Sequence, residues 1–194
     1  MSALPQRSTW TRADYLAFER EQTDIRHELI DGEIVAMSGA SYEHNVIVAN
    51  LMGLFYNQLA DRPCQNHPSD MRVHVPATGL YTYPDVSVLC GEPELEDEHG
   101  DTLLNPSVII KVLSPSTERY DRGKRFQHYR SITSLREYVL VSQEQYRIEH
   151  YIRQQDDTWI LRDLVGLDAV LELASIDCKL SLNSIYRKIT FGNQ

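Results

Sequence analysis

The chain has 194 residues, 42% of them hydrophobic and 24% charged, a composition typical of a folded globular protein, and we expect one domain over 1–194. Its 19 lysines and arginines against 28 aspartates and glutamates give a net charge of −9. Phosphate contacts need positive charge, so this balance argues against a generic nucleic-acid-binding protein, although a local basic patch or a carboxylate-rich metal site fits it. No apolar run is long enough to span a membrane, and we expect no secretory signal.

The cysteines predict a reducing environment. The three residues, Cys64, Cys90 and Cys178, lie outside any Cys-x-x-Cys motif, and three cannot all pair with one another. We therefore expect reduced thiols in a cytoplasmic protein. Cys90 falls among valines in a predicted strand, where we expect it to pack in the core.

The first third of the chain predicts a helix, a hairpin and a second helix. Thr11 has the character of a helix cap. Within 26–37, Asp31-Gly32 between two alternating segments indicates a β-hairpin with a type I′ turn. Ser41 then begins a helix to about residue 60. The apolar face of this helix carries Ile47, Leu51, Leu54, Phe55 and Leu59 at helical spacing.

The remaining two thirds predict mainly strands. In chain order these elements are strands at about 65–75, 83–90 and 107–113, a helix from 114–117 to about 131, and a strand at 137–142. The acidic loop 91–105 is expected to be exposed. Segments 146–152 and 158–163 predict a peripheral hairpin, and 180–189 a short helix or strand. The order helix, three strands, helix, strand predicts an α/β fold with the sheet covered on at least one face.

One charge in the third predicted strand needs an explanation. Residues 108–113 are apolar except for Lys111, and a lone lysine in a buried strand is costly unless a partner neutralises it. Asp85 follows Pro84 at the start of the preceding strand and is the nearest partner in the predicted order. We therefore interpret Lys111 and Asp85 as an ion pair.

Several motifs together resemble the Uma-type family, a group classed as endonucleases within the PD-(D/E)xK superfamily. They are Glu28-Leu-Ile-Asp-Gly-Glu33, Tyr83-Pro84-Asp85-Val86, Val108-Ile-Ile-Lys-Val-Leu-Ser-Pro-Ser-Thr117, Tyr120-Asp-Arg-Gly123 and Ser134-Leu-Arg-Glu-Tyr-Val-Leu-Val141. The resemblance extends over 10–186. It implies a restriction-endonuclease-like core in the order α-β-β-β-α-β over about 41–142, with an N-terminal helix and hairpin and a C-terminal β extension. It also implies Mg²⁺-dependent hydrolysis of DNA, with Asp85 in the metal site; we further expect a homodimer.

Two positions depart from the family pattern. Lys111 stands where the family usually has glutamate, and Arg125, with Lys124 beside it, stands where the family usually has lysine. Mg²⁺ requires oxygen ligands, so an ammonium at a ligand position opposes its binding. Arginine can hold phosphate but is a poor proton-transfer group. Two alternatives would preserve the chemistry: Asp70 supplies a substitute carboxylate, or Lys111 itself takes the role of the lysine.

Other candidates are less specific. His44 and Glu28 are interpreted either as edge residues of the site or as structural residues. The densest basic cluster predicts either contacts to nucleic-acid phosphates or a solvated helix face. It consists of Arg122, Lys124, Arg125 and Arg130. Three hypotheses follow: a Mg²⁺-dependent DNA endonuclease, an inactive DNA-binding member of the same fold, and an oligomeric interaction protein.

Overall fold

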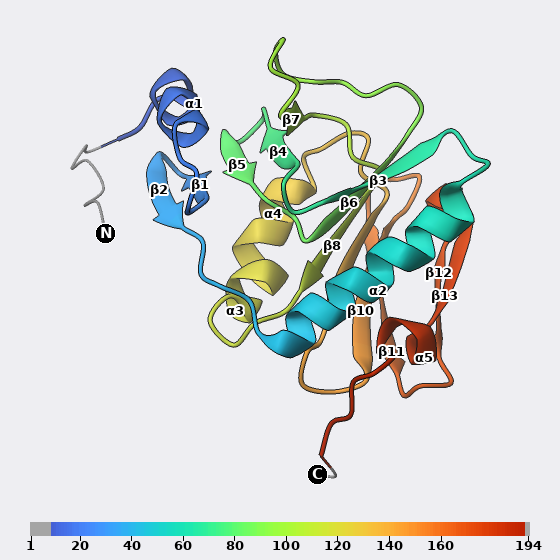
Figure 1. Cartoon of the computed structure of the whole chain (residues 1–194). Helices are drawn as coiled ribbons and strands as arrows, with labels where there is room; N and C mark the ends of the chain where they lie inside the picture. Colours follow the sequence, from blue (N-terminus) through green and yellow to red (C-terminus); the bar gives the residue numbers. More distant parts are fainter. Residues whose placement is uncertain (1–8, 193–194) are drawn as a thin grey trace.

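The computed structural model describes residues 9–192, and a six-stranded mixed sheet forms its centre, in the order β11-β10-β9-β8-β6-β3 (Figure 1). Its strands are β3 (Cys64–Pro68), β6 (Val86–Cys90), β8 (Val108–Val112), β9 (Glu137–Val141), β10 (Arg147–Arg153) and β11 (Trp159–Val165). Only β8 and β9 in this sheet run parallel, and a helical crossover joins them, as parallel neighbours require. The hairpin β10–β11 therefore extends the central sheet.

Both faces of this sheet are covered. The helix α2 (Tyr42–Leu59) begins at Ser41, whose hydroxyl caps it, and it lies across one face (Figure 1). Alternate residues of β8 enter different cores, because side chains of a strand point to opposite faces: Ile110 packs with α2, and Ile109 packs on the other side. The buried face of α2 consists of Ile47, Leu51, Phe55 and Leu59, with Leu54 partly buried.

The crossover from β8 to β9 covers the second face. It consists of α3 (Glu118–Tyr120), a π-helical turn η1 (Asp121–Arg125) and α4 (Phe126–Tyr129). Thr117 occupies the cap position, close to the predicted start. A π-turn inside a helix is uncommon and frequently lies at a functional site.

A second sheet of five strands carries the amino-terminal part, in the order β2-β1-β5-β4-β7. Its strands are β1 (His27–Ile30), β2 (Glu33–Ala36), β4 (Arg72–Val75), β5 (Leu80–Thr82) and β7 (Thr102–Leu103). The predicted type I′ turn between β1 and β2 is confirmed, since Asp31 and Gly32 have φ values of 52° and 82°. The helix α1 (Arg12–Arg20) packs on this sheet through Tyr15 and Leu16.

Two predictions about the middle of the chain were wrong. The single strand expected at 65–75 is two strands in different sheets, because the chain turns at 69–71 between β3 and β4. The loop 91–105 is not exposed throughout. Thr102 and Leu103 are buried beside β4, and Asp101 pairs with Arg20 at 2.9 Å and with Arg72 at 2.8 Å.

The C-terminal part adds a separate hairpin against α2. It consists of β12 (Val170–Leu173), a 3-10 turn η2 (Ala174–Ile176), β13 (Cys178–Ser181) and α5 (Leu182–Ile185). Their apolar side chains complete the core on the α2 side of the central sheet. The segment predicted at 180–189 as helix or strand is the end of β13 followed by α5.

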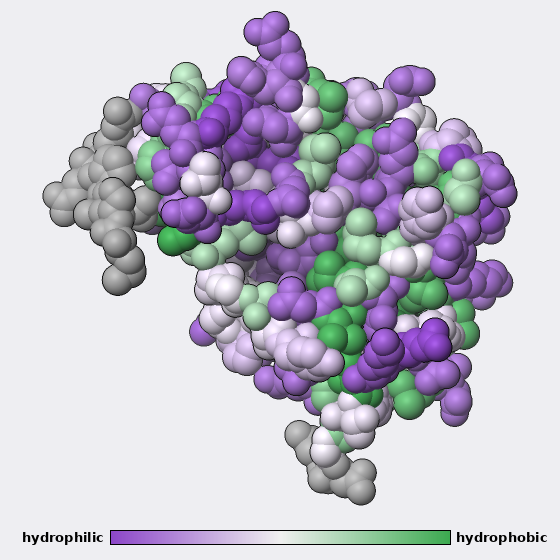
Figure 2. Space-filling model, viewed as in Figure 1, coloured by the Kyte–Doolittle hydropathy of each residue, from purple (hydrophilic) through white to green (hydrophobic). Residues whose placement is uncertain are grey.

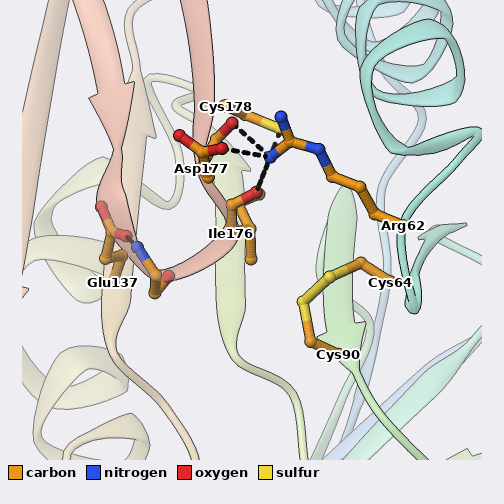
Figure 3. Close-up of a disulfide and its surroundings, with 8 residues drawn as sticks. Arg62, Cys64, Cys90, Glu137, Ile176, Asp177 and Cys178 are labelled. Atoms are coloured by element: carbon orange, nitrogen blue, oxygen red, sulfur yellow. Dashed lines mark hydrogen bonds and ion pairs between the residues drawn. A yellow bond between two sulfur atoms is a disulfide. The ribbon is translucent and has the colours of Figure 1, made fainter.

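The prediction of reduced cysteines was wrong for two of the three. Cys64 and Cys90 lie directly opposite each other on β3 and β6, with 4.0 Å between their Cα atoms, and form a disulfide (Figure 3). Sequence spacing concealed this pairing, because it depends on strand register. Cys178 is buried and free. Cys90 is partly buried against the core on the α2 side.

The order of the core elements agrees with the prediction. The strands β3, β6, β8 and β9 of the central sheet, with α2 before them and the helical crossover before β9, have the order α-β-β-β-α-β. The strands β4, β5 and β7 of the second sheet are inserted between them, and the fold is α/β of restriction-endonuclease type. Between residues 9 and 192, none of the helices has both the length and the apolar character needed to cross a bilayer.

Candidate functional site

The ion pair between Lys111 and Asp85 is present at the centre of the candidate site. Val86 lies opposite Ile110 in the antiparallel pair of β6 and β8, so the next positions along, Asp85 and Lys111, are brought face to face. The Lys111 Nζ atom lies 3.0 Å from Asp85 Oδ1, and it also donates to the carbonyl of Tyr83 at 3.3 Å. Both charged side chains are buried.

The Asp85 carboxylate is surrounded by donors. Its Oδ2 atom accepts a hydrogen bond of 2.6 Å from the backbone N–H of Val112, and His44 Nε2 lies 3.5 Å from Oδ1. Burial by itself raises the pKa of Asp85, but the Lys111 ammonium and the His44 imidazole outweigh it and lower the pKa to about 2. Asp85 is therefore a buried, ionised carboxylate with a donor on each oxygen.

A second buried ion pair lies between β1 and the π-turn. Arg125 donates from both terminal nitrogens to Glu28, at 2.6 and 2.8 Å, in a bidentate arrangement. Thr82 lies beside Glu28 on the neighbouring strand β5 and donates to its Oε1 at 2.5 Å. Burial opposes ionisation of Glu28, but the Arg125 guanidinium outweighs it and lowers the pKa of Glu28.

The π-turn adds a further carboxylate to this group. Asp121 Oδ1 lies 2.7 Å from Arg125 Nε, within ion-pair distance but without the alignment of a hydrogen bond. Asp121 is fully buried, and burial raises the pKa of its carboxyl. Arg125 is thus held between two carboxylates. Sequence reasoning missed Asp121, although its i, i+4 spacing from Arg125 within the helical segment was a usable signal.

The two ion pairs, formed by Asp85 with Lys111 and by Glu28 with Arg125, line one cavity of about 1160 Å³ between the β1–β2 hairpin, the start of α2 and the loop after β8. Asp121 is not among the residues that line it. The surface around α1 and the hairpin is predominantly hydrophilic, and apolar patches gather over α2 and the C-terminal elements (Figure 2). Besides the two ion pairs, polar side chains of the α2 start and of the loop 114–117 line the cavity. They include His44, Asn45, Ser114, Ser116 and Thr117.

Asp70 does not join the cluster. It is exposed in the turn between β3 and β4, it pairs with Arg26, and it is absent from the residues that line the cavity. Its predicted role as a substitute metal ligand therefore has no geometric support. Among residues 9–192, no group of three or more His, Cys, Asp or Glu side chains is arranged to hold a metal ion.

The predicted basic cluster is largely neutralised by carboxylates. Arg122 pairs with Glu118 at 2.6 Å and Glu149 at 2.8 Å, and the exposed Lys124 pairs with Asp31. Arg130 is exposed, with its guanidinium over the ring of Phe126. With Arg125 buried, the four side chains do not form one free cationic face.

The residues around Asp85 do not fit a Mg²⁺ ion. Mg²⁺ requires oxygen ligands at about 2.1 Å in octahedral geometry, commonly one or two carboxylates with waters. Here an ammonium nitrogen lies at hydrogen-bond distance from one carboxylate oxygen and a backbone N–H from the other. The arrangement holds a fixed pair of opposite charges inside a polar cavity.

Comparisons with known proteins agree with this fold. The Uma2 family, described as "Putative restriction endonuclease", matches residues 12–183. In Synechocystis sp. (strain ATCC 27184 / PCC 6803 / Kazusa), "Uncharacterized protein sll1609" is 39% identical over 164 residues, which covers 84% of this chain and 92% of that relative. "Uncharacterized protein slr1290" of the same strain is 38% identical over 178 residues, 92% of each chain.

A solved structure supports the architecture. The crystal structure of "a putative nuclease belonging to DUF820" from Anabaena variabilis ATCC 29413 superposes with a TM-score of 0.70, covering 85% of this chain and 92% of that chain. At 19% sequence identity this likeness concerns the fold alone. Because the family match extends over most of the sequence, the chain belongs to the Uma2 family.

Proposed function

We propose that this member of the family binds nucleic acid at the cavity and does not hydrolyse it through bound Mg²⁺. The observation that carries this proposal is the contact of 3.0 Å between Lys111 Nζ and Asp85 Oδ1. A lysine at the position where the resemblance implies a glutamate replaces a negative charge by a positive one where the ion would lie. The ammonium takes the place of the metal as counter-ion of Asp85.

The electrostatic cost of loading the site with Mg²⁺ supports the proposal. Two unit charges at about 4 Å interact by roughly 4 kcal/mol at an effective dielectric constant of 20, and a divalent ion doubles this repulsion from the ammonium. To bind Mg²⁺, Asp85 would also have to give up the 2.6 Å hydrogen bond from the N–H of Val112, the ammonium contact, or both. Arg125 is unsuited to replace a catalytic lysine, because it is enclosed by Glu28 and Asp121.

Nucleic acid is the ligand that the family description favours. The family is described as "Putative restriction endonuclease", and the solved structure of similar fold is called "a putative nuclease". The cavity is lined by hydroxyl, amide and imidazole groups, which suit phosphate and sugar oxygens, and Ser116 lies on its rim. Binding is expected to be weak and sensitive to salt, because the chain carries a net charge of −9 and pairs most of its nearby cations.

Metal titration tests the absence of Mg²⁺ chemistry. Calorimetry with Mg²⁺ and Mn²⁺ should give no binding heat for the natural protein and a saturable heat for Lys111→Glu. Lys111→Met is the matched control, since it removes the ammonium without adding a ligand, and it should bind metal weakly or not at all. Tight metal binding by the natural protein, with cleavage of a DNA duplex, would contradict the proposal and favour the endonuclease hypothesis.

Fluorescence anisotropy with a labelled DNA duplex at 50 and 200 mM salt tests the binding step. The natural protein should bind at low salt, and Ser116→Glu should weaken binding because it adds a negative charge at the cavity rim. Thr78→Glu introduces the same charge on an exposed turn that does not line the cavity, and it serves as the matched control. Equal binding by the two variants, or no binding by the natural protein, would place DNA elsewhere or exclude it as a ligand.

A further inference from the structure

Strand β11 forms one edge of the six-stranded sheet (Figure 1). It exposes apolar side chains to solvent. Five of the ten large hydrophobic residues that are exposed in the described part of the chain fall between 160 and 170. They are Ile160, Leu161, Val165, Leu167 and Val170. Natural sheets protect an exposed edge with charged side chains, especially lysine, with proline or with a bulge. β11 has no lysine or proline and pairs with β10 without a bulge. Its two charged residues are Arg162 and Asp163, and Asp163 is already paired with Arg147 of β10 at 2.8 Å. This edge is therefore suited to pairing.

The hydrogen bonds with β10 determine which backbone groups of β11 face outward. Gly166 N donates to Tyr146 O at 2.8 Å, and Gln154 N donates to Thr158 O at 2.8 Å, while the register between these two points is unbroken. The even-numbered residues of β11 therefore direct their N–H and C=O groups toward β10. The odd-numbered residues, from Trp159 to Val165, direct theirs toward the open edge.

We propose that this edge pairs with the same edge of a second copy of the chain. The two β11 strands run antiparallel about a two-fold axis that passes at Leu161, so that the two central sheets become one continuous sheet. This inference concerns an interaction surface and does not depend on the proposed nucleic-acid binding.

Charge decides the register of this pairing. In an antiparallel pair, residues that face each other have their side chains on the same side of the sheet. Odd-numbered residues of one copy therefore face odd-numbered residues of the other, and the two-fold axis must pass at a residue. An axis at Arg162 sets two guanidinium groups against each other, an axis at Asp163 sets two carboxylates together, and an axis at Ile160 opposes Asp157 to Asp163. Like charges directly opposite each other destabilise a strand pair.

An axis at Leu161 avoids all three conflicts. It sets Leu161 against Leu161 on one face and Ile160 against the aliphatic part of Arg162 on the other. Trp159 then lies opposite Asp163, and about six backbone hydrogen bonds form between the outward-directed groups. Moving the axis toward the end of the strand, to Leu164, shortens the overlap and leaves Leu161 unpaired. The edge is thus self-complementary in one register, which favours a second copy over an unrelated partner.

Sedimentation velocity of the full chain over a range of concentrations tests the proposal. The natural protein should sediment as a dimer, and Leu161→Lys should raise the dissociation constant at least about tenfold, because it sets two ammonium groups together at the axis. Leu161 is 50% exposed in the monomer, so the variant should keep its circular dichroism spectrum and its midpoint of thermal unfolding. Val35→Lys is the matched control, since Val35 is 44% exposed on β2, the edge strand of the other sheet.

Cross-linking tests the register independently. Directly opposed residues in a hydrogen-bonded antiparallel pair have Cα atoms about 5.5 Å apart, a separation that suits a disulfide. Leu161→Cys should therefore form a covalent dimer on mild oxidation, and Ile160→Cys should not. The proposal is overturned if the natural protein is a monomer throughout, if Leu161→Lys dimerises as well as the Val35→Lys control, or if Ile160→Cys cross-links in preference to Leu161→Cys.

Discussion

Replacing Lys111 by methionine should make the protein less stable, and increasingly so as the pH rises. The variant keeps most of the volume of the side chain but leaves the buried Asp85 carboxylate without its counter-ion. Loss of one partner from a buried ion pair typically costs about 3–5 kcal/mol, a large part of a total stability of about 5–15 kcal/mol. In the natural protein, the pKa of Asp85 is lowered from the ordinary 3.8 to about 2, which corresponds to a contribution of roughly 2 kcal/mol to the stability of the folded state.

The sign of the pH dependence distinguishes the two proteins. Because the pKa of Asp85 is lowered in the folded natural protein, its contribution is fully present above pH 3.8 and is lost as the pH falls through about 2. Without the ammonium, burial raises the pKa of Asp85, and the variant should lose stability as the pH rises above 3.8. The difference in unfolding free energy between the two proteins should therefore grow between pH 4 and pH 7.

Urea unfolding followed by circular dichroism at several pH values measures this difference. The same experiment in a His44→Gln background removes the contribution of the imidazole that lies 3.5 Å from Asp85. A double-mutant cycle with Asp85→Asn isolates the interaction between the two side chains. The double variant should lose at least about 1 kcal/mol less unfolding free energy than the two single variants lose together. If the losses are additive and independent of pH, the two groups do not stabilise each other and our reasoning on the site is refuted.

Two further predictions concern the framework of the site. Replacing both Cys64 and Cys90 by serine opens a loop of 26 residues and should lower the unfolding free energy by about 3 kcal/mol, measured by urea denaturation. Chemical reduction of the natural protein should give a similar loss. No loss of stability from either treatment would contradict the disulfide. Arg125→Lys keeps the positive charge but cannot form the bidentate contact with Glu28, so it should lower the unfolding free energy by about 1–3 kcal/mol in the same assay. Arg130→Lys, on the exposed helix face, is the control and should change the unfolding free energy by less than about 0.5 kcal/mol.

Local patterns predicted those parts of the fold that depend on neighbours in the sequence. The Asp31-Gly32 turn and the Ser41 cap follow from the chemistry of a few adjacent residues, and both are present. The contact between Asp85 and Lys111 could be predicted for a related reason. Lys111 lies in β8 and Asp85 immediately precedes β6, and the two strands are adjacent, so strand order and position suffice to bring the two residues together.

The features that sequence reasoning missed depend on long-range register. Glu28 and Arg125 are 97 residues apart, and they meet only because β1 pairs with β5 beside the π-turn. The disulfide depends in the same way on the alignment of β3 with β6. The break between β3 and β4 at 69–71 could not be predicted from the sequence. A polar turn between two strands and a local irregularity within one strand give the same local pattern of polar and apolar residues.

The disulfide between β3 and β6 has a consequence for the connectivity of the molecule. The chain leaves the central sheet after Pro68, contributes β4 and β5 to the second sheet, and returns at Val86. The bond between Cys64 and Cys90 closes this excursion into a covalent ring. A protease cut anywhere between 69 and 84 would therefore release no fragment until the bond is reduced. In its oxidised form the molecule would survive such a nick as one covalent unit.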